Sequence, residues 1–403
     1  MKNIKMTFKT IIISICLFMI MGASVSAKPS IDFTANNHPT LGTFQGIVDG
    51  KKGEGSFFYR FNFHDDGTVT VIKQYGGHDE KENKTWKKDG DILQITSGLN
   101  ANVIDFDKGE KILFTFMDSK TIAYKDGDYS TEFKEHKSGI AFVHWILILV
   151  VLITLNEIFR KFKWPTVFFY FILPFALIPV WAGQGVSYWF KWVKVYSVVT
   201  ACIWFTCMRY TKLGSKIFPR LIAAMFIAVN ITEAVTQDFS LGYAPNILNG
   251  VAGILSIITL FYGWKGIHID NSKERDMVWP KMTVLWIIAY DVWNFVFVYL
   301  NFPGSVSAQL MVILSCTIPS LFIKKGTWLQ ARAFTLAAWF MYYFTVPRFT
   351  ESMQLHVPRN ASLSMTLALI SIVLNVLCAV EFFKNIQKDK IAAKKNLLPP
   401  TTY

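Results

Sequence analysis

Nine apolar runs between residues 140 and 383 constrain this chain more than any other feature of its sequence. Each run approaches the roughly 20 residues that a helix needs to cross the hydrocarbon core of a bilayer. The chain is 52% hydrophobic with a mean hydropathy of +0.33, which is more apolar surface than a soluble core would bury. The short connections predict one all-α polytopic bundle with the lipid bilayer as its partner. The runs are 140–159, 165–182, 190–208, 218–236, 247–264, 282–300, 305–323, 329–346 and 362–383.

Basic residues predict the orientation of this bundle, because they concentrate on the cytoplasmic side of membrane proteins. They occur in every second connection, whereas among the opposite connections only 347–361 carries any, Arg348 and Arg359. This pattern predicts a multi-pass protein of the cell (plasma) membrane with a basic cytoplasmic tail over 386–403. The formal charge of +13 is thereby assigned to membrane topology, and no nucleic-acid partner is expected.

Residues 1–27 have the pattern of a cleavable signal peptide. Lys2, Lys5 and Lys9 precede an apolar run, and small residues lead to a cleavage site after Ala27. An uncleaved first helix is the alternative, and both would export the segment that follows.

Residues 28–137 alternate between apolar and polar positions and contain repeated Asp-Gly turns, which predicts a small antiparallel all-β extracytoplasmic domain before the transmembrane domain at 138–385. Gly42-Thr43-Phe44-Gln45-Gly46, then Asp66-Gly67-Thr68, then Trp86 to Asp91 follow in the order that small lipocalin-like domains have, so the domain resembles them. The resemblance implies a barrel. Its interior could form a ligand cup, or the domain could be a packed spacer or bind a protein partner.

Catalytic motifs give little support to an enzyme. The sequence contains no CxxC, HExxH, GxSxG, GxGxxG or P-loop pattern. We expect no cofactor and no metal site, and an enzyme is less favoured than a non-enzymatic role.

Polar residues inside the apolar runs are the best candidates for a functional site, because an ionised group near the bilayer centre costs about 2.5–3.5 kcal/mol. By the predicted topology they lie at mid-membrane or in its outer half. This shared depth predicts one polar ligand-binding chamber open to the outside, with Lys194 neutralising Glu233 or Asp291. The alternative is a buried network that fixes helix packing. The candidates are Asp291, Asn294, Glu233, Asn230, Lys194, Asn249, Tyr290 and Trp293.

Several polar strings within the helices agree in order with one family. Leu155 to Arg160, Phe190 to Ser197, Asn230 to Val235 and Ile287 to Phe295 resemble an uncharacterised bacterial multi-pass membrane-protein family, domain of unknown function 5692. The resemblance covers residues 140 to about 385 and implies an integral membrane protein without a known activity.

Three functions are therefore open. The favoured one is binding or transport of a small molecule through the polar chamber. The alternatives are a receptor or sensor, in which the β-domain binds a ligand or partner, and a carboxylate-dependent membrane enzyme that acts on a lipid-like substrate.

Overall fold

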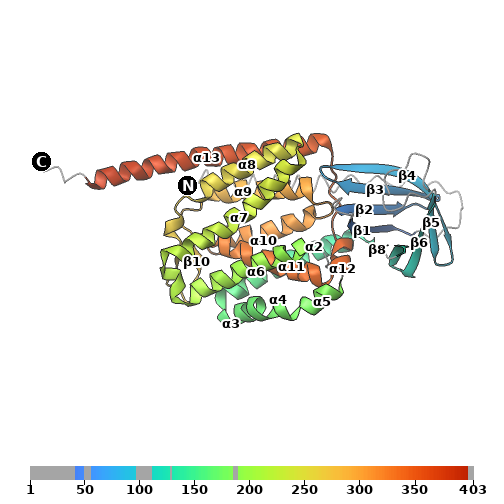
Figure 1. Ribbon diagram of the computed structural model, residues 1–403, viewed down its shortest axis with the longest axis horizontal. Helices are drawn as coiled ribbons and strands as arrows, with labels where there is room; N and C mark the ends of the chain where they lie inside the picture. Colours follow the sequence, from blue (N-terminus) through green and yellow to red (C-terminus); the bar gives the residue numbers. More distant parts are fainter. Residues whose placement is uncertain (1–40, 50–55, 97–110, 128, 185–188, 398–403) are drawn as a thin grey trace.

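The computed structural model describes residues 41–49, 56–96, 111–127, 129–184 and 189–397. The predicted signal peptide lies outside these residues. The described chain forms a barrel over residues 43–136 and a helical domain over residues 138–397, which lie end to end (Figure 1).

The barrel is closed and antiparallel, because β1 pairs with both β2 and β8. This confirms the predicted antiparallel β-domain. A tight turn links β2 and β3, where Asp66 accepts from the Thr68 amide (2.8 Å) and Gly67 supplies a φ of +80°. The strands are β1 (Thr43–Asp49), β2 (Ser56–Phe63), β3 (Thr68–Tyr75), β4 (His78–Asp89), β5 (Ile92–Thr96), β6 (Lys111–Asp118), β7 (Thr121–Asp126) and β8 (Tyr129–His136).

Aromatic side chains fill the barrel interior. Phe61 contacts Phe114 and Phe133 with ring centroids 5.5 and 5.0 Å apart, and Tyr59 and Trp86 are buried beside them. Every second residue of a strand points inward, so these positions form one apolar core. The described strands therefore enclose a packed apolar core.

All nine predicted apolar runs are helical, although the second is divided. The segments are α2 (Ser138–Lys161), α3 (Lys163–Val167), η2 (Phe168–Ile172), α4 (Leu173–Ala176), α5 (Ile178–Gly183), α6 (Trp189–Tyr210), η3 (Lys212–Ser215), α7 (Ile217–Leu241), α8 (Ala244–Leu260), η4 (Trp264–Gly266), β9 (His268–Ile269), β10 (Met277–Val278), α9 (Val284–Asn301), α10 (Val306–Phe322), α11 (Trp328–Thr345), α12 (Pro347–Ser352) and α13 (Ala361–Leu397).

The predicted count of nine membrane-length helices is wrong. In the described part of the chain, four helices are long and apolar enough to cross a membrane: α2, α7, α9 and Ala361–Ile391 of α13. Pro174 and Pro179 lie where the second run breaks into α4 and α5. α8 and α10 have 17 residues each, and Arg332 makes α11 less apolar.

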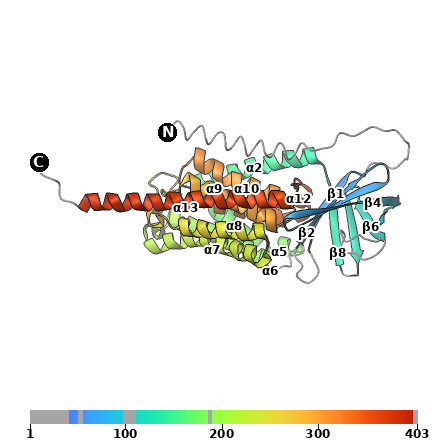
Figure 2. The same cartoon turned by 90° about the horizontal axis from the view of Figure 1, so that it is seen from above.

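Capping residues fix where the helices that carry the site begin and end. Thr283 caps α9 by accepting from the Trp286 amide at 3.1 Å, and Gly242, with a φ of +70°, ends α7. α11 is buried along most of its length and packs against α10, α6 and α2. α13 runs along the helical domain and projects beyond it on the side away from the barrel (Figure 2).

Candidate functional site

The predicted site residues lie in three groups rather than in one chamber. In the first group, Lys194 of α6 forms an ion pair with Glu233 of α7. Their side chains are 23% and 36% exposed, so the pair lies on the flank of the helical domain. Asn230 is partly buried one turn before Glu233. Lys194 therefore neutralises Glu233 and not Asp291.

The second group surrounds Asp238 near the end of α7, which sequence reasoning missed. The buried Asp238 carboxylate accepts from the side-chain amides of Asn246 (2.9 Å), Asn249 (2.8 Å) and Asn301 (2.7 Å). The Asn249 carbonyl also accepts from the Trp293 indole at 3.0 Å. Asn249 and Trp293 thus join α7, α8 and α9, and this network fixes helix packing.

Glycines on α8 serve the same packing. The helix is continuous, so Gly250 and Gly253 do not break it. A Cβ at Gly253 would lie 2.8 Å from the Trp293 Nε1, which is closer than such contacts allow. A Cβ at Gly250 would lie 3.0 Å from the Phe239 ring of α7, so the two glycines permit α8 to approach both α7 and α9 closely.

The third group is centred on Asp291 in the middle of α9. Its Oδ2 accepts from the Thr317 hydroxyl of α10 at 2.6 Å, and that hydroxyl accepts from the Trp328 indole at 2.9 Å. One turn along α9, the Asn294 Oδ1 accepts from Gln309 and from the Arg332 Nη2, the latter at 3.1 Å. Helices α9, α10 and α11 each contribute to this cluster.

Four polar atoms of the Asp291 cluster are buried without a hydrogen-bonding partner among the described residues: the Asp291 Oδ1, the Tyr290 hydroxyl, and the Arg332 Nε and Nη1. The Arg332 guanidinium lies beside Tyr290 and Asp291, and its contact with the Tyr290 hydroxyl is a hydrogen bond of poor geometry. Tyr290 is 0% and Arg332 5% exposed. An unsatisfied buried polar group costs about 1–3 kcal/mol, so four together need a physical reason.

Arg332 is the largest omission from the predicted site. It is a basic residue five positions into α11, and intramembrane charge alone would have identified it. Gln309 and Thr317 carry no such signal, because polar uncharged residues are common in apolar helices. Their role becomes visible only when α10 packs against α9.

The junction between barrel and helical domain is a second polar site. We define the junction as the outward side chains of β1 to β3, residues 76–79, the end of β8, and residues 302–304 and 347–360. The Gln45 side-chain amide donates to the carbonyls of Glu351 (2.9 Å), Gln354 (3.0 Å) and Ser352 (3.1 Å). Gln74 donates to Val357 at 3.1 Å.

Charged groups of the junction are largely withdrawn from water. The Arg359 Nη1 donates to Gly76 (2.6 Å) and its Nη2 to Phe302 (2.7 Å). Burial raises the pKa of Asp79 to about 6 and lowers the pKa of His136 and of His356 to about 4. His136 is therefore neutral at pH 7, and its Nδ1 donates to the Ser352 carbonyl at 2.7 Å.

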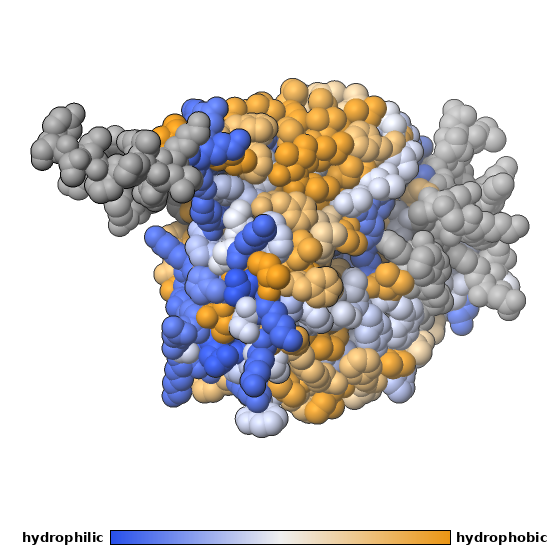
Figure 3. Space-filling view, turned by 60° about the vertical axis from the view of Figure 1, so that its left-hand side comes forward, coloured by the Kyte–Doolittle hydropathy of each residue, from blue (hydrophilic) through white to orange (hydrophobic). Residues whose placement is uncertain are grey.

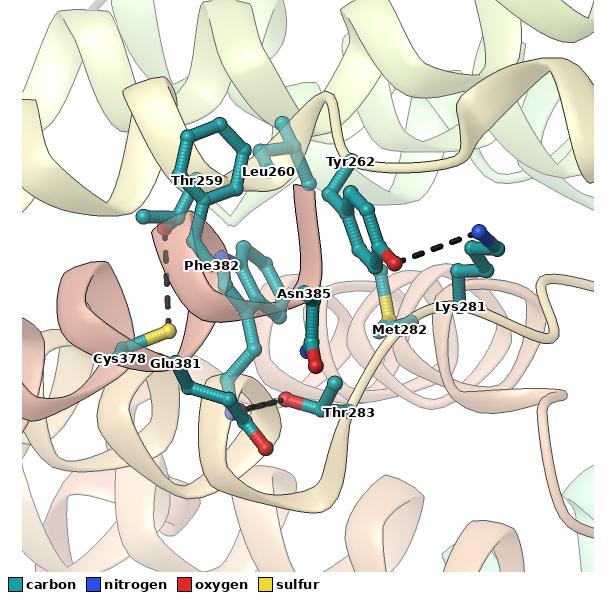
Figure 4. A pocket seen from close by; sticks show the side chains of 11 residues that line it. Thr259, Leu260, Tyr262, Lys281, Met282, Thr283, Cys378, Glu381, Phe382 and Asn385 are labelled. Atoms are coloured by element: carbon teal, nitrogen blue, oxygen red, sulfur yellow. Dashed lines mark hydrogen bonds between the residues drawn. The ribbon is translucent and has the colours of Figure 1, made fainter. Parts of the chain in front are cut away.

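A small cavity of about 20 Å³ lies between the end of α8, the start of α9 and α13 (Figure 4). It has room for about one water molecule. Thr283 donates to Glu381 at 2.8 Å beside it, and Cys378 faces Thr259. Among the described residues, no three His, Cys, Asp or Glu side chains are placed to hold a metal ion.

A closed barrel followed by four membrane-length helices and a buried Asp–Arg cluster indicates a membrane-associated protein. The chain belongs to the family of unknown function DUF5692, whose family model matches residues 135–399. The match begins at the end of β8 and covers the helical domain, which confirms the family to which the helical strings were assigned. No curated protein and no solved structure matches the chain.

Proposed function

We propose that this protein is a multi-pass protein of the plasma membrane that binds a small polar molecule in its helical domain and carries it across the bilayer. In this proposal the barrel is extracytoplasmic and the basic tail over 386–403 is cytoplasmic. Two observations support this orientation. The connections 302–304 and 347–360 contact the barrel, whereas Arg160, Arg209 and Lys324 meet the 270–276 loop at the other end.

The unsatisfied atoms of the Asp291 cluster carry this proposal. Arg332 offers two hydrogen-bond donors, Asp291 offers an acceptor, and the Tyr290 hydroxyl can serve as either. A small molecule with both an anionic or carbonyl group and an amine or hydroxyl would satisfy all four. Such a molecule would also offset the cost of burying these atoms.

A transporter also needs a route to its site. Thr317 and Gln309, which hold Asp291 and Asn294, both belong to α10. A small displacement of α10 would therefore release both contacts and open the cluster, so binding and helix movement would be linked.

A thermal-stability screen of the purified protein in detergent tests the proposal. The probes are amino acids, amines and small carboxylates, run on the wild type, on Asp291→Asn and on Glu233→Gln. A ligand at about 100 times its dissociation constant adds roughly 2.7 kcal/mol of stability. We expect a hit that Asp291→Asn abolishes.

Glu233→Gln is the matched control, because it makes the same chemical change in the exposed ion pair of the same domain. It should retain the hit. A hit that both variants keep would remove the Asp291 cluster as the binding site. No hit with any probe would favour a packing role for the cluster.

A receptor is the second candidate function, and the junction favours it. The barrel interior is packed, so a partner would contact its outer wall and not enter it. The buried contacts of Gln45 and Arg359 hold the barrel against α12 and α9. A displacement of the barrel on partner binding would therefore move these helices. Removal of residues 28–137 should then abolish a response, whereas a transporter should keep basal uptake.

A further inference from the structure

A groove of about 560 Å³ opens at the end of the helical domain away from the barrel. It lies between η3, the first turn of α7 and β9. Figure 3, turned to bring this end forward, shows hydrophilic side chains gathered beside apolar surface. The lining residues are Met208, Tyr210, Thr211, Lys212, Gly214, Ser215, Arg220, His268, Ile269 and Arg275.

The charge of this groove has one sign. Lys212, Arg220 and Arg275 line it, and none of the ten lining residues is acidic. Of the three acids in the 270–276 loop, Glu274 lies beside Ser272, and the other two face basic partners. Asp270 pairs with Lys324 at 2.7 Å, and Asp276 pairs with Arg160 at 2.9 Å. The groove therefore keeps a positive potential that suits an anion.

Two of the cations are held in place by the fold. The Arg220 Nη1 donates to the Lys265 carbonyl at 3.0 Å. Arg275 has a φ of +51°, and among the described residues it is the one non-glycine with a positive φ. Its Nε donates to the Arg209 carbonyl at 2.6 Å. Residues other than glycine seldom adopt a positive φ, and such backbone strain persists where function requires a fixed position.

We propose that this groove binds the phosphate headgroup of an anionic phospholipid. The Thr211 and Ser215 hydroxyls donate to the Cys207 and Lys212 carbonyls, so the lining cations Lys212 and Arg275 would contact the phosphate oxygens. Ile217 and Phe218, 51% and 66% exposed, adjoin the groove and would contact acyl chains. Basic pockets at the cytoplasmic ends of helices bind such headgroups. The inference rests on the membrane insertion proposed above, but not on the Asp291 site.

Binding can be measured on the full chain in neutral detergent by native mass spectrometry and thermal shift. The probes are phosphatidylglycerol, phosphatidylcholine and inorganic phosphate. The variants are Lys212→Gln, Arg275→Gln and, as a matched control, Lys273→Gln. Lys273 is exposed and two residues from Arg275, but it does not line the groove.

Each lining cation that is removed should weaken phosphatidylglycerol binding about fivefold, since a basic residue at a membrane surface contributes about 1 kcal/mol. Lys273→Gln should change it less than twofold. An equal loss in all three variants would indicate diffuse charge and overturn the site. Phosphate binding as tight as phosphatidylglycerol binding would overturn the lipid assignment, and equal binding of phosphatidylcholine would overturn recognition of anions. Failure to find a ligand for the Asp291 cluster in the thermal-stability screen would leave all these lipid-binding results unchanged.

Discussion

Replacement of Gln45 by leucine should loosen the junction more than any other single change on the barrel wall. Gln45 is 1% exposed, and its side-chain amide faces three carbonyl oxygens at 2.9–3.1 Å. The amide has two hydrogens, so at most two carbonyls are fully satisfied at once. Leucine has a similar volume and no donor. The Ser352 carbonyl keeps His136 and the Glu351 carbonyl keeps the Gln354 amide as donors, so the Gln354 carbonyl is the one that loses its partner, at about 1–3 kcal/mol.

Hydrogen exchange followed by mass spectrometry measures this loss where it occurs. Peptides that cover β1 and α12 should exchange faster in Gln45→Leu, and the thermal midpoint of the protein should fall. Gln94→Leu is the control, because Gln94 is only partly buried and lies on β5, which pairs with β4 and β6 within the barrel. Unchanged exchange at β1 and α12, or an equal effect of Gln94→Leu, would refute the assignment of Gln45 as the main polar contact of the junction.

Four further outcomes are expected. Gly304→Ala should destabilise the junction, because its Cβ would lie 2.6 Å from the Phe58 Cδ2. Gly90→Ala is the control: it also has a positive φ but faces open space, so it should cost only the backbone strain of that φ. Thermal unfolding of the two variants compares these costs. Burial lowers the pKa of His136 and of His356 to about 4, so the folded state binds fewer protons than the unfolded state between pH 4 and 6.5, and the stability should rise with pH in that range. Asp79, whose pKa is raised to about 6, opposes this rise. His136→Gln should flatten the rise in pH-dependent melting curves. Arg332→Met should destabilise the helical domain by about 3–5 kcal/mol by leaving Asp291 uncompensated, and the double variant with Asp291→Asn should recover part of the loss in denaturant titrations. Lys194→Gln should cost less than about 1 kcal/mol in the same titration, since the Lys194–Glu233 pair is partly exposed.

The barrel was predictable because its signals are local. Asp66-Gly67 fixes a turn, and alternation along Phe57 to Phe63 fixes which side chains face inward. Closure between β1 and β8 joins residues more than 80 positions apart, and no local pattern encodes that pairing. Whether the interior would be empty depended on the sizes of side chains from all strands together, which the structure resolves in favour of a packed core.

Only the charged residues of the candidate site were predictable from the sequence. Asp291 and Glu233 are conspicuous in apolar runs, but their partners depend on helix rotation. Asp291 meets Thr317 of α10, whereas Glu233 meets Lys194 of α6. Helix length was also overestimated, because hydropathy does not register that Pro174 and Pro179 divide a run into short segments.

The site and the junction are connected by the same two helices. α11 carries Arg332 and leads within two residues to α12, whose carbonyls accept from Gln45. α9 carries Asp291 and ends at Asn301, next to Phe302 and Gly304, which contact Arg359 and Gln74. A displacement of the barrel would thus act on the barrel-side ends of both helices that hold the Asp291–Arg332 cluster. If ligand binding at the cluster is coupled to barrel position, Gln45→Leu should change ligand affinity although Gln45 does not contact the cluster, and Gln94→Leu should not. Equal affinities in the two variants would make the barrel mechanically independent of the site.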